Sequence, residues 1–444
     1  MRKTILSLSF IICNLSFSTA QRLWTIDDCI SYAMQNNISL QKSRLQLQSA
    51  GEDVRSSKGA LLPTLSANTS QSLGYRPWQD NGTATVTNGQ VNTKVDKTYY
   101  NGSYGLNAQW TVWNGNRNRN TLRMARLAER QAELDVKEQA NTIQERIAQL
   151  FVQCLYLHEA IGVSQASLET SRKNEDRGKE MVQVGKMSKA DLAQLTAQRA
   201  TDEYNVVEAG TQLASYKLQL RQLLELKADE DFDIAIPPAT DDDALAQIPA
   251  LQTVYESALA TRPEIDNRKL AIESSDLSLA VAKAGWLPTV SASGGFTTST
   301  NSLTGNSWGN QMKTNTNMSA GLTVSVPIFD GWQTRSMVNK ARIAQQEAQL
   351  DLMDQQKALY QTIEGIWLDA TSNQQKFRAA TLTADSEQQS YDLLNEKFTL
   401  GLTNIIELLQ GKDKLLAAQQ NQLQSKYMTL LNLQLLRFYA GNGM

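Results

Sequence analysis

Two stretches of the chain alternate apolar with small polar residues over a length typical of β-strands. From residue 100 to 112 every second residue is apolar, aromatic or glycine, and a similar alternation returns from residue 318 to 328. Residues 64–75 and 289–298 alternate more weakly. A period of two places one kind of side chain on each face of a strand. The pattern predicts four strands of about 10 to 12 residues, either in a soluble sandwich or in a membrane barrel.

After each pair of strands the apolar residues change to a helical period. Residues 116–184 and 333–400 contain no proline and few glycines, so each stretch predicts one helix of roughly 100 Å at about 1.5 Å per residue. The apolar residues form coiled-coil seams. In the first helix they are Ile143, Ile147, Leu150, Cys154, Leu157, Ile161 and Leu168, and in the second Ile363, Ala370, Phe377, Ala384, Tyr391 and Phe398.

Shorter partner helices are expected at residues 188–226 and 404–438. The clearest seam of the second partner is Leu409, Leu416, Leu423 and Leu430. Gln, Asn, Ser, Thr and Ala cover the remaining faces of all four helices, so each helix exposes a polar surface to water. Long helices with polar faces, in antiparallel pairs, indicate a hollow assembly rather than a solid bundle.

The sequence repeats itself. Residues 58–67 return at 283–292 with a shift of 225, whereas Val184-Gly185 returns as Leu400-Gly401 with a shift of 216. The drop of nine predicts a shorter loop between the strands of the second copy. Two copies of one unit, each a helix, a strand pair and a long helix pair, are expected. Their predicted bounds are 21–227 for the first repeat, 228–250 for the linker and 251–444 for the second repeat.

The beginning of the chain has the layout of a secretory signal peptide. Residues 1–20 combine a basic start, an apolar stretch and small residues before the expected cleavage. The mature chain is therefore expected to begin near Gln21 and to work outside the cytoplasm. A lipid anchor at Cys13 is the weaker alternative, because Ile12 stands where a small residue is expected. No stretch of about 18 apolar residues follows, so no transmembrane helix is expected.

Composition narrows the class of protein further. Without Arg2 and Lys3 the chain has 41 basic and 45 acidic residues, a balance that argues against a nucleic-acid partner. Cys29 and Cys154 are the two cysteines beyond the leader, and they predict free buried thiols rather than a disulfide framework.

The number of strands decides between the sandwich and the barrel. Four strands cannot close a barrel, and open strand edges are not tolerated in lipid. Several chains must therefore pool their strands, and three chains would supply twelve. The predicted fold is an α+β membrane protein whose four strands per chain are pooled between copies, giving a 12-stranded β-barrel if three chains associate. Residues 78–97 and 300–316 would form the outward-facing loops.

Five short motifs resemble the TolC family of outer-membrane efflux proteins. They are Leu62-Pro63 and Leu287-Pro288 before strands, Pro327–Gly331 between a strand and a helix, and the turns Val184-Gly185 and Leu400-Gly401. The match covers essentially the whole mature chain in the right order. The resemblance implies a homotrimer in the cell outer membrane that spans into the periplasm and contacts outer-membrane lipid. Its trimeric 12-stranded β-barrel, four strands per chain, would be continuous with a long periplasmic α-helical coiled-coil barrel.

The resemblance also implies a function. Such a channel conducts small molecules, among them drugs, toxic compounds or metals, from the periplasm to the exterior. Its partners would be a periplasmic adaptor (membrane fusion) protein and an inner-membrane efflux pump of the RND or ABC type, and it would have no enzymatic activity and no cofactor. The alternative from the residues alone is a structural or adhesive coiled-coil protein of the periplasm or cell surface.

The resemblance places the gate and the adaptor contact at the two turns that join the helix pairs. The expected adaptor-contact residues are Val184, Gly185, Lys186, Met187, Ser188, Leu400, Gly401, Leu402, Thr403 and Asn404. Asp191 and Glu407 follow the turns at equivalent positions, so a trimer would carry six carboxylates that attract cations around the narrowest point. Their spacing from Ser188 and Asn404 also matches a helix N-cap, and one carboxylate can serve both roles.

The gate departs from the family pattern at three positions. The family has an aromatic residue three positions before the second glycine, an Arg two positions after it and a second acid on the following helix. Here these positions hold Phe398, which has no hydroxyl, Thr403 and Gln410. The polar clasps implied by the resemblance are therefore missing, and a hydrophobic latch through Phe398 is the expected alternative.

Other candidate sites are weaker. Cys154 and His158 are one helical turn apart, which fits a thiolate with its base or half a zinc site, but a structural role is favoured. Asp241-Asp242-Asp243 fits an ion site or, preferably, an acidic linker. Five aromatic residues are either anchors at a lipid boundary or ordinary packing: Tyr75, Trp78, Tyr104, Trp110 and Trp286. No phosphate loop, catalytic triad or metal cluster is recognised.

Overall fold

The computed structural model describes residues 23–78, 81–86, 89–94, 96–227, 230–237 and 240–441. The expected signal peptide and Cys13 lie outside these residues. The chain divides into two compact units, each built from segments of both sequence halves. The first comprises Met1–Lys42, Glu138–Arg262 and Ala358–Met444, and the second Ser43–Lys137 and Pro263–Lys357. The two longest helices, α3 (Arg117–Gln183) and α9 (Gln333–Thr399), contribute to both units.

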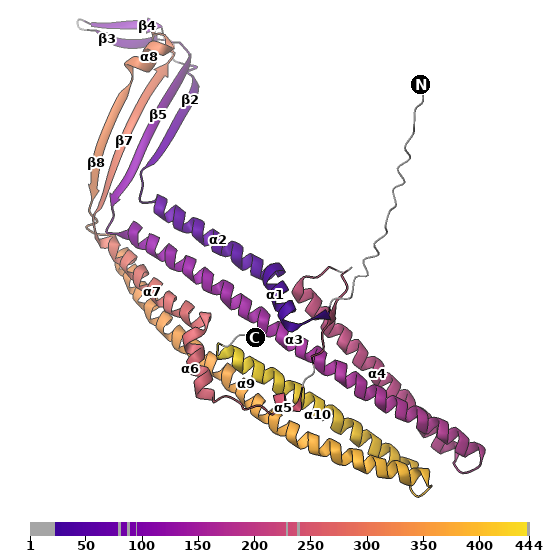
Figure 1. Ribbon diagram of the computed structural model, residues 1–444. Helices are drawn as coiled ribbons and strands as arrows, with labels where there is room; N and C mark the ends of the chain where they lie inside the picture. The colour runs from indigo at the N-terminus through magenta and orange to yellow at the C-terminus, as the bar shows by residue number, and fades with distance from the viewer. Residues whose placement is uncertain are drawn as a thin grey trace, which may run out of the picture. The chain divides into compact units, whose positions relative to one another are not determined.

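The second unit contains a four-stranded antiparallel sheet in the order β2-β5-β7-β8 (Figure 1). Its strands are β2 (Thr64–Tyr75), β5 (Thr98–Trp113), β7 (Thr289–Asn301) and β8 (Asn317–Ser325). The four predicted strands are thus confirmed. β8 ends earlier than predicted because Pro327 has no N–H to donate to a neighbouring strand. Within the described residues, β2 and β8 each pair on one side only.

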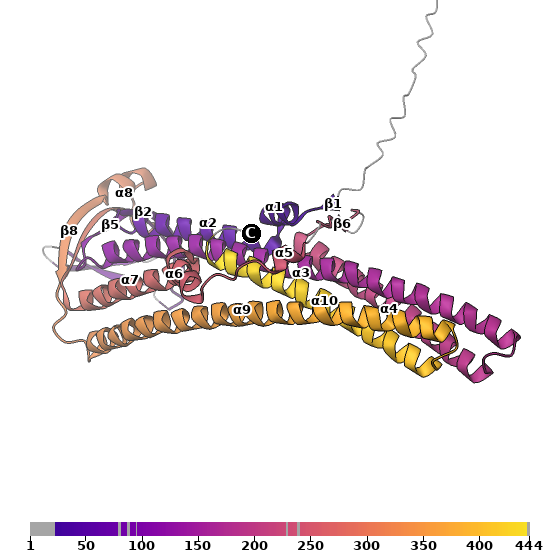
Figure 2. The same cartoon turned by 60° about the horizontal axis from the view of Figure 1, so that its bottom comes forward.

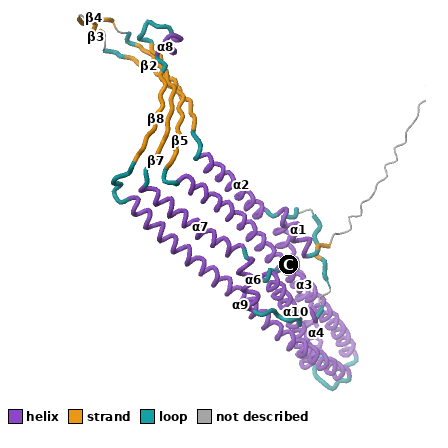
Figure 3. Tube along the Cα trace, turned by 60° about the vertical axis from the view of Figure 1, so that its left-hand side comes forward, coloured by secondary structure: helices purple, strands orange, loops and turns teal. Residues whose placement is uncertain are grey.

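The two connections at the far ends of these strands are not the plain loops expected from the sequence. A hairpin of β3 (Asn81–Val86) and β4 (Gly89–Lys94) follows β2, and α8 (Trp308–Thr314) lies between β7 and β8 (Figure 3). Residues 78–97 were expected to form a loop, although the dipeptide Asn88-Gly89 within a Thr- and Val-containing alternation is a hairpin signal. The carbonyl of Met312 in α8 accepts a 2.8 Å bond from the Thr298 hydroxyl of β7.

Helices α2 (Ile38–Gly59) and α7 (Pro263–Lys283) lead into the sheet, the second through the short 3₁₀ helix η1 (Ala284–Trp286). Side chains at the end of β5 and the start of α3 hold the α2–β2 junction. The Trp110 indole donates to the Leu61 carbonyl at 3.0 Å, and the Asn118 amide donates to the Ala60 carbonyl at 2.9 Å. The Leu-Pro motif therefore marks a fixed corner between helix and strand.

The first unit contains two helical hairpins. In one, α3 pairs with α4 (Lys189–Leu224), and in the other, α9 pairs with α10 (Ile405–Tyr439) (Figure 2). All four predicted helices are confirmed within about two residues at each end. Smaller elements of this unit are β1 (Leu23–Trp24), α1 (Ile26–Asn36), β6 (Asp233–Ile234), α5 (Asp241–Ala244) and α6 (Leu251–Thr261). Among the helices described, none is both long and apolar enough to cross a membrane.

The buried residues confirm two of the predicted seams and correct the third. All six seam residues of α9 are between 0% and 6% exposed, and all those of α3 except Ile161 are buried. The predicted α10 seam is wrong by one position, since its four leucines are half-buried. The buried stripe is Leu408, Leu415, Thr429 and Leu436. α10 contacts helices of both hairpins, so its buried face is wider than that of a two-helix coiled coil.

Each hairpin has one close approach between a glycine and a leucine. A Cβ on Gly178 of α3 would lie 2.6 Å from a methyl of Leu195 on α4, and a Cβ on Gly411 of α10 would lie 2.6 Å from a methyl of Leu394 on α9. The 216-residue shift relates position 178 to 394 and position 195 to 411. The two repeats therefore have a glycine and a leucine at the same contact. In the first repeat the glycine lies on the longer helix, and in the second it lies on the shorter one.

This contact predicts a steric effect of Gly411→Leu. The extra side chain should destabilise the second hairpin by about 1–3 kcal/mol because it overpacks the space that Leu394 already fills. Adding Leu394→Ala should recover most of the loss, measured as the thermal unfolding midpoint of the detergent-purified protein. Gly365→Leu is the control, because no other element of the described chain lies within 4 Å of a Cβ at Gly365. An equal loss in this control would contradict the proposed contact.

Candidate functional site

The two turns that join the helix pairs share one backbone geometry. Gly185 and Gly401 adopt φ values of 71° and 72°, which L side chains rarely allow. The amide after each glycine donates to the carbonyl five residues back, at 2.8 Å for Lys186 and 2.9 Å for Leu402. These are the bonds of a Schellman motif, which closes the end of a helix. The repeated Val-Gly and Leu-Gly pairs are thus helix stops of fixed shape.

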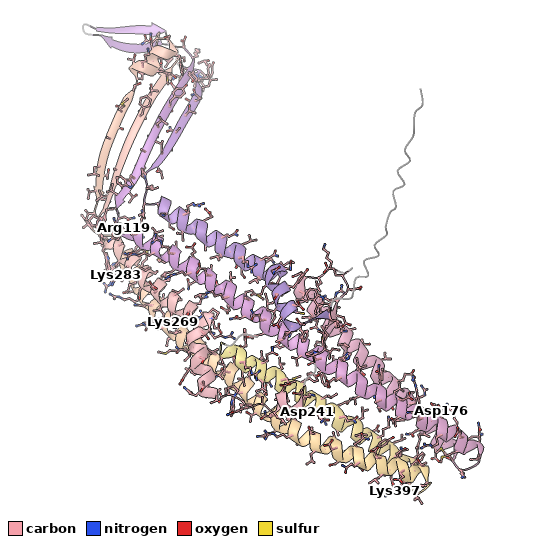
Figure 4. The ribbon with its side chains drawn as sticks, viewed as in Figure 1. Arg119, Asp176, Asp241, Lys269, Lys283 and Lys397 are labelled. Carbon is pink, nitrogen blue, oxygen red and sulfur yellow. The ribbon has the colours of Figure 1, made fainter. Side chains whose placement is uncertain are left out.

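The other expected contact residues lie around these glycines. Met187 and Thr403 are half-buried, and the remaining residues are exposed: Val184, Lys186, Ser188, Leu400, Leu402 and Asn404. Figure 4 shows Asp176 and Lys397 near the ends of the two hairpins, on the helices that lead into the turns. The turns therefore present a mixed apolar and polar surface.

Asp191 and Glu407 occupy the third position of their helices, as expected for capped residues. The Asp191 N–H donates to Ser188 Oγ at 3.1 Å, and the Glu407 N–H donates to Asn404 Oδ1 at 2.9 Å. The Asp191 carboxylate accepts from Ser188 Oγ at 2.8 Å. The Glu407 carboxylate accepts from the Thr403 hydroxyl and, at 3.3 Å, from Asn404 Nδ2. The structure shows the capping role, and the gate role of both acids stays a prediction.

Thr403 and Gln410 differ in their surroundings. Thr403 stands where the resemblance implies an Arg, and its hydroxyl donates to the carboxylate of Glu407 four residues later in the same chain segment. Gln410 is exposed. Neither residue provides, within the described residues, a hydrogen bond between the two hairpins.

Phe398 is 5% exposed and belongs to an apolar cluster behind the turns. Leu195 of the first hairpin packs with residues of the second hairpin, and Met187 from the first turn packs against the cluster. The buried members are Leu195, Tyr391, Phe398, Ile405, Leu408 and Leu415. The cluster thus joins the hairpins by apolar contact, which supports the prediction of a hydrophobic latch through Phe398.

A buried charged pair lies next to this cluster. The Lys412 ammonium of α10 bonds to the Asp202 carboxylate of α4, and the side chains are 3% and 1% exposed. Ser171 of α3 donates to the same carboxylate at 2.5 Å. Taking two charges out of water is costly unless both remain paired. The pair therefore fixes how the second hairpin sits against the first.

Further polar contacts surround the pair. Arg199 Nε of α4 lies 2.9 Å from Glu175 Oε2 of α3, and the two residues form an ion pair within the first hairpin. Asn174 and Tyr391 form a 3.5 Å bond between α3 and α9, and a 2.9 Å bond joins Arg177 to the Thr399 hydroxyl. The hairpins are thus linked by polar bonds both at the surface and in the interior.

Asp202 and Lys412 were not identified as buried residues from the sequence, although their positions in the helices indicate it. Asp202 lies seven residues after the buried Leu195, and Lys412 lies four residues after Leu408 and three before Leu415. Both charges therefore stand at seam positions. A charge at a seam position predicts a partner in the core, because an unpaired charge there is very costly.

Cys154 and His158 do not form a common site. Cys154 is fully buried, and burial raises the pKa of its thiol to about 12, whereas His158 is exposed. Cys29 and Cys154 are both free and buried, as expected. Among the residues that the structure describes, no group of three His, Cys, Asp or Glu could hold a metal ion.

The acidic run at residues 241–243 begins helix α5. The Thr240 hydroxyl and the Asp243 carboxylate form a capping box there. Asp241 also forms a 2.9 Å ion pair with Lys426 of α10. These contacts give the run a structural role at a helix start, in agreement with the linker interpretation rather than the ion site.

The candidate aromatic anchors lie in the second unit. Tyr75, Trp78, Trp110 and Trp286 are between 40% and 92% exposed. Tyr104 is half-buried, and its ring packs edge-on against Trp308 with centroids 6.1 Å apart. Four of the five residues are therefore exposed enough to be anchors, and Tyr104 is packed within the sheet and α8.

This arrangement of sheet and helical hairpins is the fold of outer-membrane channel proteins. The crystal structure of the Campylobacter jejuni CmeC outer membrane channel matches with a TM-score of 0.79 and 17% identity, over 94% of this chain and 86% of that one. The outer membrane efflux protein BepC of Brucella suis biovar 1 (strain 1330) is 21% identical over 404 residues, 91% of this chain and 82% of BepC. The outer membrane protein TolC of Salmonella enteritidis is 21% identical over 428 residues, 94% of this chain and 82% of TolC.

The family model described as outer membrane efflux protein matches residues 29–225 and 254–442. The chain therefore belongs to the outer membrane efflux protein family, which confirms the resemblance inferred from the motifs. Its place is the outer membrane, and its family is one of transport proteins.

The buried pair predicts a large effect of Lys412→Met. The variant leaves the Asp202 carboxylate buried without its cation. We expect the free energy of unfolding of the packed hairpins to fall by about 3–5 kcal/mol. The double variant Lys412→Met with Asp202→Leu should recover most of it, because no buried charge remains. Thermal unfolding of the detergent-purified protein measures both. Lys414→Met, which removes an exposed lysine of the same helix, should have little effect, and equal losses for Lys412→Met and Lys414→Met would contradict the interpretation.

The buried thiol predicts slow alkylation. With its pKa raised to about 12, the Cys154 thiol should stay protonated and unmodified at pH 9 in the folded protein, whereas an unfolded cysteine ionises near 8.5. Mass spectrometry after treatment with iodoacetamide, on a Cys29→Ala background, measures this. Modification in urea but not in buffer is the expected result. Rapid modification of the folded protein would show that the helix seam opens at Cys154.

Proposed function

We propose that this chain is the outer-membrane exit channel of a tripartite efflux or secretion system. It conducts small molecules from the periplasm to the exterior as a homotrimer. A periplasmic adaptor docks at the two turns, and an inner-membrane pump of the RND or ABC type supplies the energy. The chain moves solutes by changes in helix packing and performs no bond chemistry. The observation that carries this proposal is a four-stranded sheet with two open edges in a protein of the outer membrane efflux family.

The open edges support the trimer. In lipid every backbone N–H and C=O must be satisfied by the protein, so β2 and β8 each need a further strand. Large apolar residues are exposed on the strands, as a lipid-facing surface requires: Leu65, Leu73, Leu106, Met318, Leu322 and Val324. Pairing of β8 in one copy with β2 in the next satisfies both edges, and three copies close a twelve-stranded barrel.

The gate is proposed at the ends of the hairpins. Asp191 and Glu407 would form the acidic ring, and Phe398 with the apolar cluster would hold the hairpins together when the channel rests. The Asp202–Lys412 pair lies between α4 and α10, so separation of the hairpins would have to break it. A pump and adaptor would therefore have to offset the loss of both apolar and ionic contacts.

A structural or adhesive coiled-coil protein is the competing interpretation. It would need no lipid-facing strands, so it would be recovered in the soluble periplasmic fraction. The exit channel should instead be extracted only by detergent. Recovery of folded protein without detergent would contradict the channel.

The acidic ring predicts the ion selectivity of single channels. Purified trimers in a planar bilayer should give small, stable, cation-preferring currents that divalent cations block. The double variant Asp191→Asn with Glu407→Gln should lose much of this preference and block, because the local negative charge attracts cations. Unchanged ion selectivity in a folded double variant would contradict the proposal of an acidic ring.

A matched pair of variants separates charge from capping. Ser188→Ala with Asn404→Ala removes the hydrogen bonds to the Asp191 and Glu407 amides but keeps both carboxylates. It should cost about 0.5–2 kcal/mol at each helix start and leave the cation preference in place. A change of selectivity in the cap variant alone would show that the acids act only through the caps.

A further inference from the structure

The helix ends next to the sheet carry cations at positions shared by both repeats. Lys58 and Lys283, related by the 225-residue shift, end α2 and α7, and Arg119 and Arg335, related by the 216-residue shift, lie in the first turns of α3 and α9. All four are exposed. Figure 4 shows Arg119 and Lys283 where the helices meet the strands. Within the described part of the chain, no ion pair involves any of the four, which we name the basic collar.

Charge is segregated at this level of the second unit. Residues 117–126 contain four arginines and no acid, and residues 333–346 contain two arginines, one lysine and no acid. The whole chain, by contrast, has a formal charge of −2. Exposed charges on an ordinary soluble surface are interspersed, so this excess of cations indicates a negatively charged partner.

Exposed apolar and aromatic side chains lie beside the collar, between β8 and α9. Ile328 is 96% exposed, Phe329 80% and Trp332 61%. With Trp286, Asp330 and Arg335 they line a cavity of about 270 Å³. The Arg335 guanidinium carbon lies 4.9 Å from the centre of the Trp332 ring. One cation of the collar is therefore in contact with the apolar surface that continues from the end of β8.

The backbone at Trp332 is strained, although its side chain is 61% exposed. Trp332 has φ 69°, and its counterpart in the first repeat, Asn116, has φ 64°. Asn tolerates this left-handed conformation, whereas a bulky residue there is an outlier. A Cβ added to Gly115 would lie 2.9 Å from Leu287. A Cβ added to the equivalent Gly331 would have no atom of the described chain within 4 Å, apart from its two neighbours in sequence. The turn before α9 thus keeps a largely exposed indole at a conformational cost, which is typical of functional positions.

We propose that the basic collar binds the phosphate groups of anionic glycerophospholipids in the periplasmic leaflet of the outer membrane. Trp286 and Trp332 lie at the boundary between headgroup and acyl chain, where amphipathic rings are favoured. Asp330, the carboxylate of this cavity, accepts a 2.7 Å bond from the Thr334 amide at the start of α9, so one of its oxygens is used in capping that helix. The proposal rests on the proposed function, because it requires that the strands lie in lipid.

Two features favour lipid over a second copy of the chain as the partner. The collar repeats at every junction of helix and strand, so a trimer carries it all around its circumference, whereas contacts between copies recur only at the β2 and β8 edges. The junctions also offer few acids with which a second copy could neutralise the four cations. They are the paired Glu52 and its neighbour Asp53 near the end of α2, and Asp330, which caps α9.

The test compares lipid binding to the wild-type trimer and to a quadruple variant, Lys58→Gln, Arg119→Gln, Lys283→Gln and Arg335→Gln. Detergent-purified trimers are titrated with phosphatidylglycerol or with phosphatidylcholine, and bound lipid is counted by native mass spectrometry. The wild type should prefer phosphatidylglycerol, and the variant should lose this preference by roughly tenfold or more, since each cation near a lipid surface contributes on the order of a fivefold effect. The matched control, Arg172→Gln, Lys189→Gln, Lys376→Gln and Arg378→Gln, neutralises four exposed residues of the first unit and should keep the preference.

Channel currents of the same variants separate this proposal from the proposed function. A quadruple variant that conducts normally but still prefers phosphatidylglycerol would contradict lipid binding by the basic collar and would leave the proposed channel function standing. Altered ion selectivity with unchanged lipid binding would place the cations in the lumen and also overturn it. Where the quadruple variant fails to assemble, Arg119→Gln with Arg335→Gln is used, and loss of the trimer without loss of lipid preference would assign the collar to contacts between copies. Absence of any insertion by the wild type would instead contradict the proposed function itself.

Discussion

The hydrogen-bonding edges of the four-stranded sheet constrain the rest of the structure. Within the described residues, β2 and β8 have one strand partner each, and an unpaired edge is not tolerated in lipid. If the strands lie in lipid, as proposed, a single chain would leave both edges unpaired, which is the reason for proposing a trimer. Each repeat contributes one antiparallel strand pair, β2–β5 in the first and β7–β8 in the second. The antiparallel pairing of β5 with β7 joins the two repeats into one sheet, so the same pairing satisfies the inner edges of both. The same β-hairpin geometry can continue into the next copy without a new kind of contact.

The two repeats keep the geometry of a contact while changing its residues. The exchange of Gly178 and Leu195 for Leu394 and Gly411 keeps one side chain in each close approach, because the space between the helices admits one leucine and not two. The left-handed turn before each long helix is kept in the same way by different residues. The two repeats thus share the volume and the backbone conformation at these positions while the residues themselves differ.

The long elements could be predicted from the sequence because their signals are repeated many times. Each α3 and α9 seam contains six or seven apolar residues at coiled-coil spacing, and proline is absent throughout. The α10 seam was misplaced by one residue because α10 packs on several helices, and its half-buried leucines resemble a seam as well as its buried ones do. The β3–β4 hairpin and α8 were missed because polar, glycine-rich segments were interpreted as loops. The Asp202–Lys412 pair could not be recognised as a pair from sequence, since only the packing of two hairpins brings residues 210 positions apart together.

Capping at the hairpin ends would not compete for the same atoms with the proposed gating. The cap bonds use the backbone N–H groups of Asp191 and Glu407 and the side chains of Ser188 and Asn404. The Glu407 carboxylate is held separately by Thr403 and Asn404 Nδ2, so its charge stays at the first turn of α10, where a helix N-terminus stabilises an anion. A hydroxyl at position 403 neutralises none of that charge, whereas the Arg implied by the family pattern would. Within the described residues no ion pair involves Glu407. Under the proposed gating, the absence of the Arg would remove a clasp, so resting closure would rely on the apolar cluster and the buried pair, and the acids would remain available to cations.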